Sequence, residues 1–187
     1  MSQVGSVNVT RVGILGSGIM GSGVAEVAAG AGYEVILRSR SLESAREMMV
    51  AIDRILVKAI ARGRASEEDR SAILARITVT DDVAALADCD LVIESVVEDL
   101  AVKRALFADL DRLVKPGAIL ATNTSTLPVI ELATATQRPE SVCGIHFFNP
   151  APVMTLVEVV RPVTASDKTI ATAIEFATRC GKDAIET

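Results

Sequence analysis

The sequence predicts an α/β fold in which a doubly wound, mostly parallel sheet is covered by helices on both faces. Apolar runs of strand length alternate with longer segments of helical period, as in chains built from repeated strand–helix–strand units. Runs such as Leu-Val-Ile-Glu-Ser-Val-Val (residues 91–97) and Gly-Ala-Ile-Leu-Ala-Thr (117–122) are almost continuously apolar, which is typical of strands buried on two sides. A glycine-rich turn joins the first strand to the first helix.

The predicted elements follow one another along the whole chain. Apolar runs predict strands at residues 9–15, 34–37, 77–80, 90–97, 118–122, 142–147 and 156–160, and a last short strand within 181–187. Helical periodicity predicts helices at residues 19–31, 102–114, 127–134 and 168–180.

One segment interrupts the alternation. Residues 42–60 have helical period, and Ser66, followed by three acidic residues, is a good start for a second helix. We therefore expect a helical hairpin inserted at about residues 42–76. From the pattern alone, a packing role and a functional role for this hairpin are equally open.

Composition and charge exclude several classes of protein. The 187 residues are 50% hydrophobic, enough for one ordinary core, and the net charge of −5 argues against a nucleic-acid-binding surface. No apolar run is long enough to span a membrane, and the first ten residues lack the features of a secretory signal. The three widely spaced cysteines (Cys89, Cys143 and Cys180) fit buried thiols better than a disulfide framework or a zinc site. We expect a cytoplasmic protein with no metal site.

The glycine-rich turn predicts a dinucleotide site. Gly16-Ser17-Gly18-Ile19-Met20-Gly21 fits the pattern G-x-G-x-x-G and lies between an apolar strand and a helix. In this pattern the first glycine allows a tight turn, the second admits the pyrophosphate, and the third lets the helix pack close to the strand. Free amide groups at the helix start then face the phosphates. The motif and its setting predict a Rossmann-type dinucleotide-binding domain over residues 1–187.

The end of the second predicted strand bears on which dinucleotide binds. In NAD-binding domains an acidic residue near this position binds the ribose diol, but here the position is Ser39, with Arg38 and Arg40 beside it. A carboxylate repels a 2′-phosphate, whereas a serine hydroxyl and a guanidinium attract one. The sequence therefore predicts a preference for NADP(H) over NAD(H). The alternative is that Arg40 only stacks on adenine and other groups hold the ribose.

The only histidine, His146, lies at the end of a predicted strand, where ligands bind in open α/β sheets. Glu158 lies on the next predicted strand, and a proline-containing connection between the two can fold that strand back. An imidazole oriented by a carboxylate is a competent general base near neutral pH. A structural histidine that caps the strand is the alternative.

A second polar cluster follows another predicted strand. Residues 121–128 read Ala-Thr-Asn-Thr-Ser-Thr-Leu-Pro. Asn123 and Ser125 either cap the next helix or present hydrogen-bond donors to a substrate carbonyl or a nicotinamide. Spacing leaves both alternatives open.

Four segments form a combined signature: GILGSGIMGSGVAEVAA (13–29), IESVVEDLAVKRALFADLD (93–111), ATNTSTLPV (121–129) and GIHFFNPAPVMTLVEVV (144–160). Together they resemble the 3-hydroxyacyl-CoA dehydrogenase family, and most of all its 3-hydroxybutyryl-CoA dehydrogenase branch. The resemblance implies NAD(P)-dependent oxidation of a (3S)-3-hydroxyacyl-CoA, by default 3-hydroxybutyryl-CoA, to the 3-oxoacyl thioester, or the reverse reduction. Such a reaction belongs to fatty acid metabolism.

The resemblance also implies roles for individual residues. His146 takes the proton of the 3-hydroxyl group, Glu158 pairs with His146, and Ser125 hydrogen-bonds the substrate oxygen. The residues implied to line the nicotinamide and its ribose are Glu98, Lys103 and Asn123. The helical hairpin is implied to help hold the CoA portion, with Arg54, Lys58 and Arg62 as candidate phosphate contacts.

Two departures from the family pattern affect these expectations. The family normally has an acidic residue where this chain has Ser39, which puts NAD specificity in doubt. Family members also continue into an all-helical domain that supplies a catalytic asparagine and the dimer interface, so we expect this chain alone to be poorly active and the full-length enzyme to be a homodimer. Three alternatives stay open: an NAD(P)-binding module without turnover, a dehydrogenase of acyl carrier protein thioesters, and a member of the related beta-hydroxyacid group, which the HFFNP segment disfavours.

Overall fold

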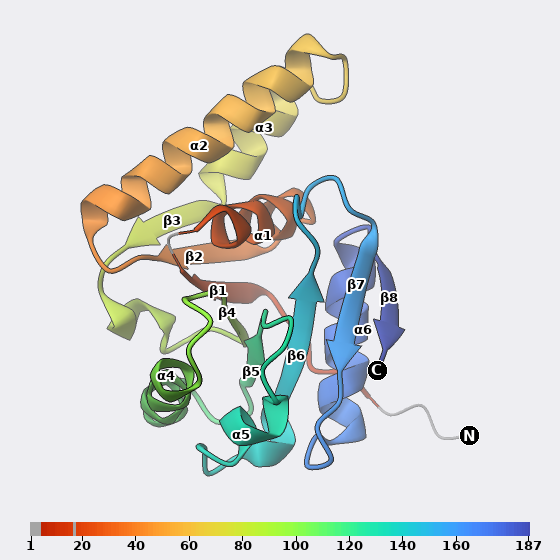
Figure 1. The fold of residues 1–187 in the computed structure, drawn as a ribbon. Coiled ribbons are helices and arrows are strands. Elements are labelled where there is room, and N and C mark those ends of the chain that lie inside the picture. Colours follow the sequence, from red (N-terminus) through yellow and green to blue (C-terminus); the bar gives the residue numbers. More distant parts are fainter. Residues whose placement is uncertain (1–4, 17) are drawn as a thin grey trace.

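The computed structural model describes residues 5–16 and 18–187, and its centre is an eight-stranded sheet (Figure 1). The strands lie in the order β3-β2-β1-β4-β5-β6-β7-β8. Neighbouring strands are parallel except for β6 and β7, which are antiparallel. The predicted mostly parallel sheet is thereby confirmed. The strands are β1 (Arg11–Leu15), β2 (Glu34–Arg38), β3 (Ile77–Thr80), β4 (Leu91–Glu94), β5 (Ile119–Thr122), β6 (Val142–Phe147), β7 (Leu156–Val160) and β8 (Asp183–Glu186).

Helices cover both faces of the sheet because successive strand residues point to opposite sides. In β4, Leu91 and Ile93 join one apolar cluster with α1 (Ile19–Gly30) and α6 (Asp167–Arg179), whereas Val92 joins a second cluster with α4 (Leu100–Leu113) and α5 (Val129–Ala133). The part of the chain that the structure describes contains no helix that is both long and apolar enough to cross a membrane. The helices are α1 (Ile19–Gly30), α2 (Leu42–Ala61), α3 (Glu67–Ala75), α4 (Leu100–Leu113), α5 (Val129–Ala133) and α6 (Asp167–Arg179), with short 3₁₀ turns at Val83–Leu86 and Pro139–Ser141.

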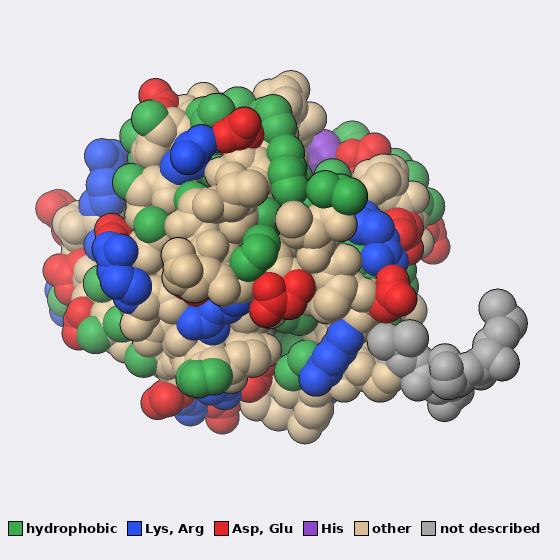
Figure 2. Space-filling model, turned by 90° about the horizontal axis from the view of Figure 1, so that it is seen from below, with side chains coloured by type: hydrophobic (Ala, Val, Ile, Leu, Met, Phe, Trp, Pro, Cys, Tyr) green, Lys and Arg blue, Asp and Glu red, His purple; other side chains and the backbone are tan. Residues whose placement is uncertain are grey.

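The helices α2 and α3 form an arm that extends away from the sheet, in the segment where the sequence predicts a hairpin (Figure 1). Each begins at a serine: the hydroxyl of Ser41 accepts a hydrogen bond from the amide of Ser44, and Ser66 forms a reciprocal capping box with Asp69. Cationic and anionic side chains are interspersed over the face seen in Figure 2.

The strand β4 is shorter than predicted, and its last residue explains why. The carboxylate of Glu94 accepts a hydrogen bond from the amide of Val96 at 2.6 Å, which takes that amide out of the ladder. The chain therefore leaves the sheet at Ser95, although the residues that follow are apolar enough for a strand. This early exit opens space at the carboxyl end of β4.

Asp90 fixes the entry into β4. Its carboxylate accepts hydrogen bonds from the amides of Thr10 and Arg11, at 2.8 and 2.9 Å, and lies 2.6 Å from the ammonium of Lys115. Burial alone would raise the pKa of Asp90, but the hydrogen bonds from Lys115, Arg11 and Thr10 prevail and lower it to about 2.

We therefore expect Asp90→Asn to lower the free energy of unfolding by about 2 kcal/mol at pH 7, since each pKa unit corresponds to about 1.4 kcal/mol. The folded-state pKa lies below the unfolded value near 4, so the stabilisation is complete above about pH 4 and disappears as the pH falls toward 2. Urea unfolding at neutral and acidic pH measures the difference, with the exposed neighbour Asp88→Asn as the control. Equal losses in the two variants would contradict the assignment.

Candidate functional site

A cleft of about 950 Å³ opens at the carboxyl ends of the parallel strands, a size common among ligand sites. It runs from the glycine turn between β1 and α1, past the segments that follow β2, β4 and β5, to the end of β6. The structure brings most of the predicted site residues to its wall: Gly16, Gly18, Ile19, Met20, Ser39, Arg40, Glu98, Asn123, Ser125 and His146. Three predicted site residues, Glu158, Gly21 and Lys103, are not among the residues that line the cleft.

Of the three glycines in the turn, only one leaves open space in which part of a ligand can lie. Gly16 has φ +134°, and a Cβ there would lie 2.2 Å from the carbonyl oxygen of Ser95, so only glycine fits. A Cβ at Gly21 would lie 2.5 Å from the oxygen of Gly16, which explains how α1 packs so close to β1. A Cβ at Gly18 would meet nothing within 4 Å. The open space in front of Gly18 therefore fits a diphosphate; Ser17 lies outside the described residues.

The start of α1 adds hydrogen-bond donors to this space. Gly18 is the N-cap residue, and no side chain among the described residues caps the helix. The first amides of a helix have no intrahelical acceptor, and they favour an anion at this end. The turn can thus hold the pyrophosphate of a dinucleotide.

At the end of β2 the structure changes the predicted role of Ser39. This side chain is only 2% exposed, and its hydroxyl donates a hydrogen bond to the hydroxyl of Ser44 at 2.9 Å. The predicted serine donor for a 2′-phosphate is therefore already used within the protein. Arg38 donates to the carbonyl of Asp81, whereas Arg40 is exposed on the cleft wall and forms no ion pair with any described residue.

At the other end of the cleft, His146 and Glu158 face each other across the antiparallel pair β6–β7. The register places them directly opposite, and the imidazole Nδ1 lies 2.8 Å from a carboxylate oxygen of Glu158. The ring of Phe148 lies against the imidazole, with 4.6 Å between ring centroids. Because Glu158 engages Nδ1, Nε2 is the ring nitrogen left to exchange a proton.

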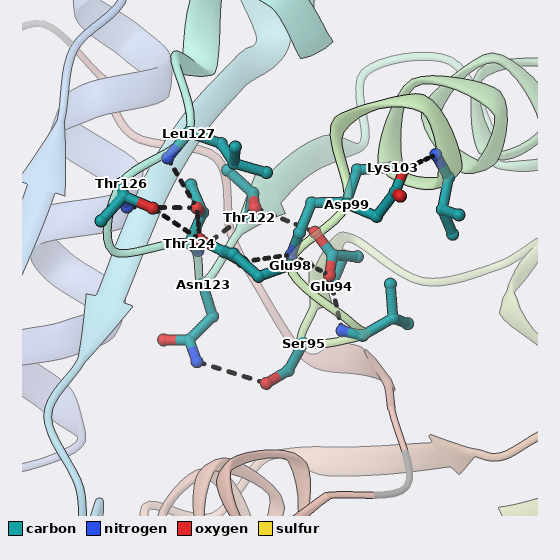
Figure 3. A network of polar contacts seen from close by, with 12 residues as sticks. Glu94, Ser95, Glu98, Asp99, Lys103, Thr122, Asn123, Thr124, Thr126 and Leu127 are labelled. Atoms are coloured by element: carbon teal, nitrogen blue, oxygen red, sulfur yellow. Dashed lines mark hydrogen bonds and ion pairs between the residues drawn. The ribbon is translucent and has the colours of Figure 1, made fainter.

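Asn123 connects three strand ends around this cleft. Its side-chain oxygen accepts a hydrogen bond from the amide of Phe147 at 2.7 Å. Its side-chain nitrogen donates to the hydroxyl of Ser95 at 3.2 Å, as Figure 3 shows. These bonds join the ends of β4, β5 and β6, so Asn123 also has a structural role that the sequence did not indicate. The neighbouring Ser125 is exposed on the cleft wall.

A buried ion pair supports the wall beneath these residues (Figure 3). Glu94 and Lys103 are 0% and 1% exposed, and the Lys103 ammonium lies 2.6 Å from a Glu94 oxygen. The second oxygen of Glu94 accepts a hydrogen bond from Thr122 at 2.9 Å. Lys103, which the resemblance places against the nicotinamide ribose, is thus held inside the domain by Glu94. A glutamate in an otherwise apolar strand was the sequence signal for this anchor, because a buried charge needs a partner.

Glu98 is the only acidic residue among the described residues that line the cleft. It accepts a hydrogen bond from the hydroxyl of Thr124 and lies 3.3 Å from the Lys103 ammonium. Burial raises the pKa of Glu98, but Thr124 and Lys103 outweigh it, so the pKa is lowered. An ionised carboxylate thus faces the cleft and can accept hydrogen bonds from ligand hydroxyls.

Known proteins are similar to this chain in sequence and in fold. The profile of the family described as 3-hydroxyacyl-CoA dehydrogenase, NAD binding domain, matches residues 11–187. A 3-hydroxybutyryl-CoA dehydrogenase of Mycobacterium tuberculosis is 45% identical over 183 residues, which cover 95% of this chain and 63% of that protein. One from Bradyrhizobium diazoefficiens is 41% identical over 174 residues, covering 93% of this chain and 59% of that protein.

A solved structure gives the same result. The crystal structure of 3-hydroxybutyryl-CoA dehydrogenase from Escherichia coli K12 matches with a TM-score of 0.94 and 40% identity, and the match covers 96% of this chain and 38% of that one. This chain therefore spans less than two thirds of the length of each of these relatives. The family profile includes the glycine turn, the Glu98 segment and the His146–Glu158 pair. The chain belongs to the 3-hydroxyacyl-CoA dehydrogenase family and matches its NAD-binding domain.

Proposed function

We propose that this chain binds a nicotinamide dinucleotide in the cleft and supplies the general base for oxidation of a (3S)-3-hydroxyacyl-CoA, by default 3-hydroxybutyryl-CoA. The observation that supports this most is the arrangement of the cleft, with an open glycine turn at one end and a carboxylate-paired imidazole at the other. The names of the relatives are consistent with such a substrate.

Four side chains have different roles in the proposed reaction. The glycine turn and Glu98 would hold a nicotinamide dinucleotide, and such a cofactor would supply the hydride chemistry at the substrate carbon that carries the reacting oxygen. Nε2 of His146 takes the proton of the substrate hydroxyl, because Glu158 occupies Nδ1 and stabilises the imidazolium that forms. Ser125, exposed in the same cleft, hydrogen-bonds the reacting oxygen. Glu98 accepts hydrogen bonds from the ribose hydroxyls.

Two measurements test this function. Fluorescence titration of the chain with NADH and NADPH tests the binding step, and the absorbance of the reduced cofactor in the presence of acetoacetyl-CoA tests turnover. The same assay with an acyl carrier protein thioester distinguishes the two carriers. Absence of dinucleotide binding would refute the proposal. Binding without turnover by the full-length protein would favour a cofactor-binding module, which has no need of an imidazole paired with a carboxylate.

We further propose that the chain prefers NADP(H), now on the strength of Arg40 alone. Its guanidinium is exposed on the cleft wall, and position 39 has no carboxylate to repel a 2′-phosphate. Arg40→Ala should raise the dissociation constant for NADPH by about tenfold, the equivalent of one charge-assisted hydrogen bond, and leave that for NADH nearly unchanged. The exposed Arg64→Ala is the control. Tighter binding of NADH than of NADPH by the unaltered chain would disprove the preference.

A further inference from the structure

The connection between β6 and β7 determines how His146 and Glu158 meet. Residues 148–155 join the two strands, so any shift of this connection changes the register of the pair. It also contains Phe148, whose ring packs on the imidazole. The connection leaves the top of β6 in Figure 1 and returns as β7. What holds it in place therefore affects the candidate base.

One side of the connection is seated on α1. Ala151 is 2% exposed, and a Cβ built at Gly23 would lie 3.2 Å from its Cβ. α1 begins at the glycine turn, so this contact joins the phosphate end of the cleft to the imidazole end. A contact between apolar atoms fixes a distance but does little to fix the orientation of the backbone.

Lys182 supplies the directional contacts. It precedes β8, and its ammonium donates hydrogen bonds to the carbonyl of Ala151 at 2.6 Å and to that of Met154 at 2.9 Å. The amide of the next residue, Asp183, donates to the carbonyl of Thr155 at 2.8 Å. Three carbonyls of the connection are thus bound from one short segment.

A buried carboxyl group lies near the same ammonium. Glu26, on α1, is 8% exposed, and its Oε2 has no hydrogen-bond partner among the described residues. Burial raises the pKa of Glu26 to about 7, although the positive charge of Lys182 acts to lower it. Burial likewise lowers the pKa of Lys182, although the negative charge of Glu26 acts in the opposite direction. The ammonium therefore has one acidic neighbour in addition to its two carbonyls.

We propose that Lys182 is a positioning residue for His146, which it holds through the carbonyls of Ala151 and Met154. The proposal rests on the proposed function only for its catalytic meaning, since the hydrogen bonds themselves determine the conformation. Lys182 lies outside the cleft wall and reaches the reacting groups only through the connection.

Nuclear magnetic resonance of the chain tests this directly, because its single histidine gives one set of imidazole signals. In the unaltered chain we expect a nuclear Overhauser contact between the imidazole of His146 and the ring of Phe148, and a nitrogen shift that shows Nδ1 engaged. Lys182→Met should weaken or abolish both signals while the fold is retained. Lys182→Arg, which still donates, should restore them in part. If the methionine variant is unfolded by circular dichroism, Lys182→Gln replaces it.

Two controls sharpen the outcome. Lys168→Met, an exposed lysine on α6, should leave the imidazole signals unchanged. Glu26→Gln removes the nearby charge but leaves both hydrogen bonds of Lys182, so it should also preserve them. Unchanged signals in Lys182→Met, or an equal loss in Glu26→Gln, would overturn the proposal.

Failure of the proposed function would look different. If the chain does not bind dinucleotide but the imidazole signals still depend on Lys182, the positioning role stands and the proposed function is disproved. If the chain binds NADPH but the imidazole signals do not depend on Lys182, the proposed function stands and the positioning role is disproved. In the full-length protein, Lys182→Met should lower kcat by about 10–100-fold at unchanged KM for the cofactor, as expected for a misplaced catalytic group.

Discussion

Replacement of His146 by glutamine is expected to lower kcat for acetoacetyl-CoA by about 10²–10⁴-fold, the usual loss when a general base is removed. The dissociation constant for the dinucleotide should stay nearly the same, because the glycine turn and Arg40 lie at the other end of the cleft. Steady-state assays of the full-length protein and cofactor titrations measure the two quantities separately.

Two further variants define what this result means. Glu158→Gln preserves the shape of the pair but removes the charge that stabilises the imidazolium, so kcat should also fall, by up to about 10⁴-fold. Val163→Ala, at a side chain 92% exposed after β7, should change neither quantity. A loss of less than tenfold in His146→Gln would show that the imidazole is not the base.

Lys103→Met is expected to lower the free energy of unfolding by about 3–5 kcal/mol, the range observed when one member of a buried ion pair is removed. The variant leaves Glu94, which is fully buried, with a charge that only the amide of Val96 and the hydroxyl of Thr122 can stabilise. Urea unfolding followed by circular dichroism measures the loss, and the exposed Lys168→Met provides the baseline.

A double-mutant cycle separates charge from packing at this pair. Glu94→Gln combined with Lys103→Met removes both charges, and much of the stability lost in Lys103→Met should return. If the free energy of unfolding of Lys103→Met lies within about 1 kcal/mol of that of the unaltered chain, the pair is not coupled as its 2.6 Å separation indicates.

The fold could be predicted from the sequence because its strands are short apolar runs with clear boundaries. The strands β1 to β8 all lie within or next to predicted runs, and α1, α4, α5 and α6 overlap the predicted helices. The error at β4 shows the limit of such patterns. Apolar character continues through Val97, but the strand ends where the carboxylate of Glu94 accepts a hydrogen bond from the amide of Val96.

The site was partly predictable for a similar reason. His146 and Glu158 are separated by twelve positions on two strands that a turn can pair, so their meeting follows from local geometry. Sequence separation alone did not reveal the partners of two buried polar side chains, although these partners lie only five and nine positions away. The hydroxyl of Ser39 binds Ser44 because the chain folds back after β2, and Lys103 turns inward because β4 presents Glu94 to it.

The antiparallel return of β7 has a consequence for how such enzymes diversify. Because β7 runs back beside β6, His146 and Glu158 belong to one short stretch of the chain in which they are twelve positions apart, whereas the glycine turn lies far upstream. An exchange of this stretch between relatives would therefore transfer His146 and Glu158 together and leave the glycine turn and Arg40 unchanged.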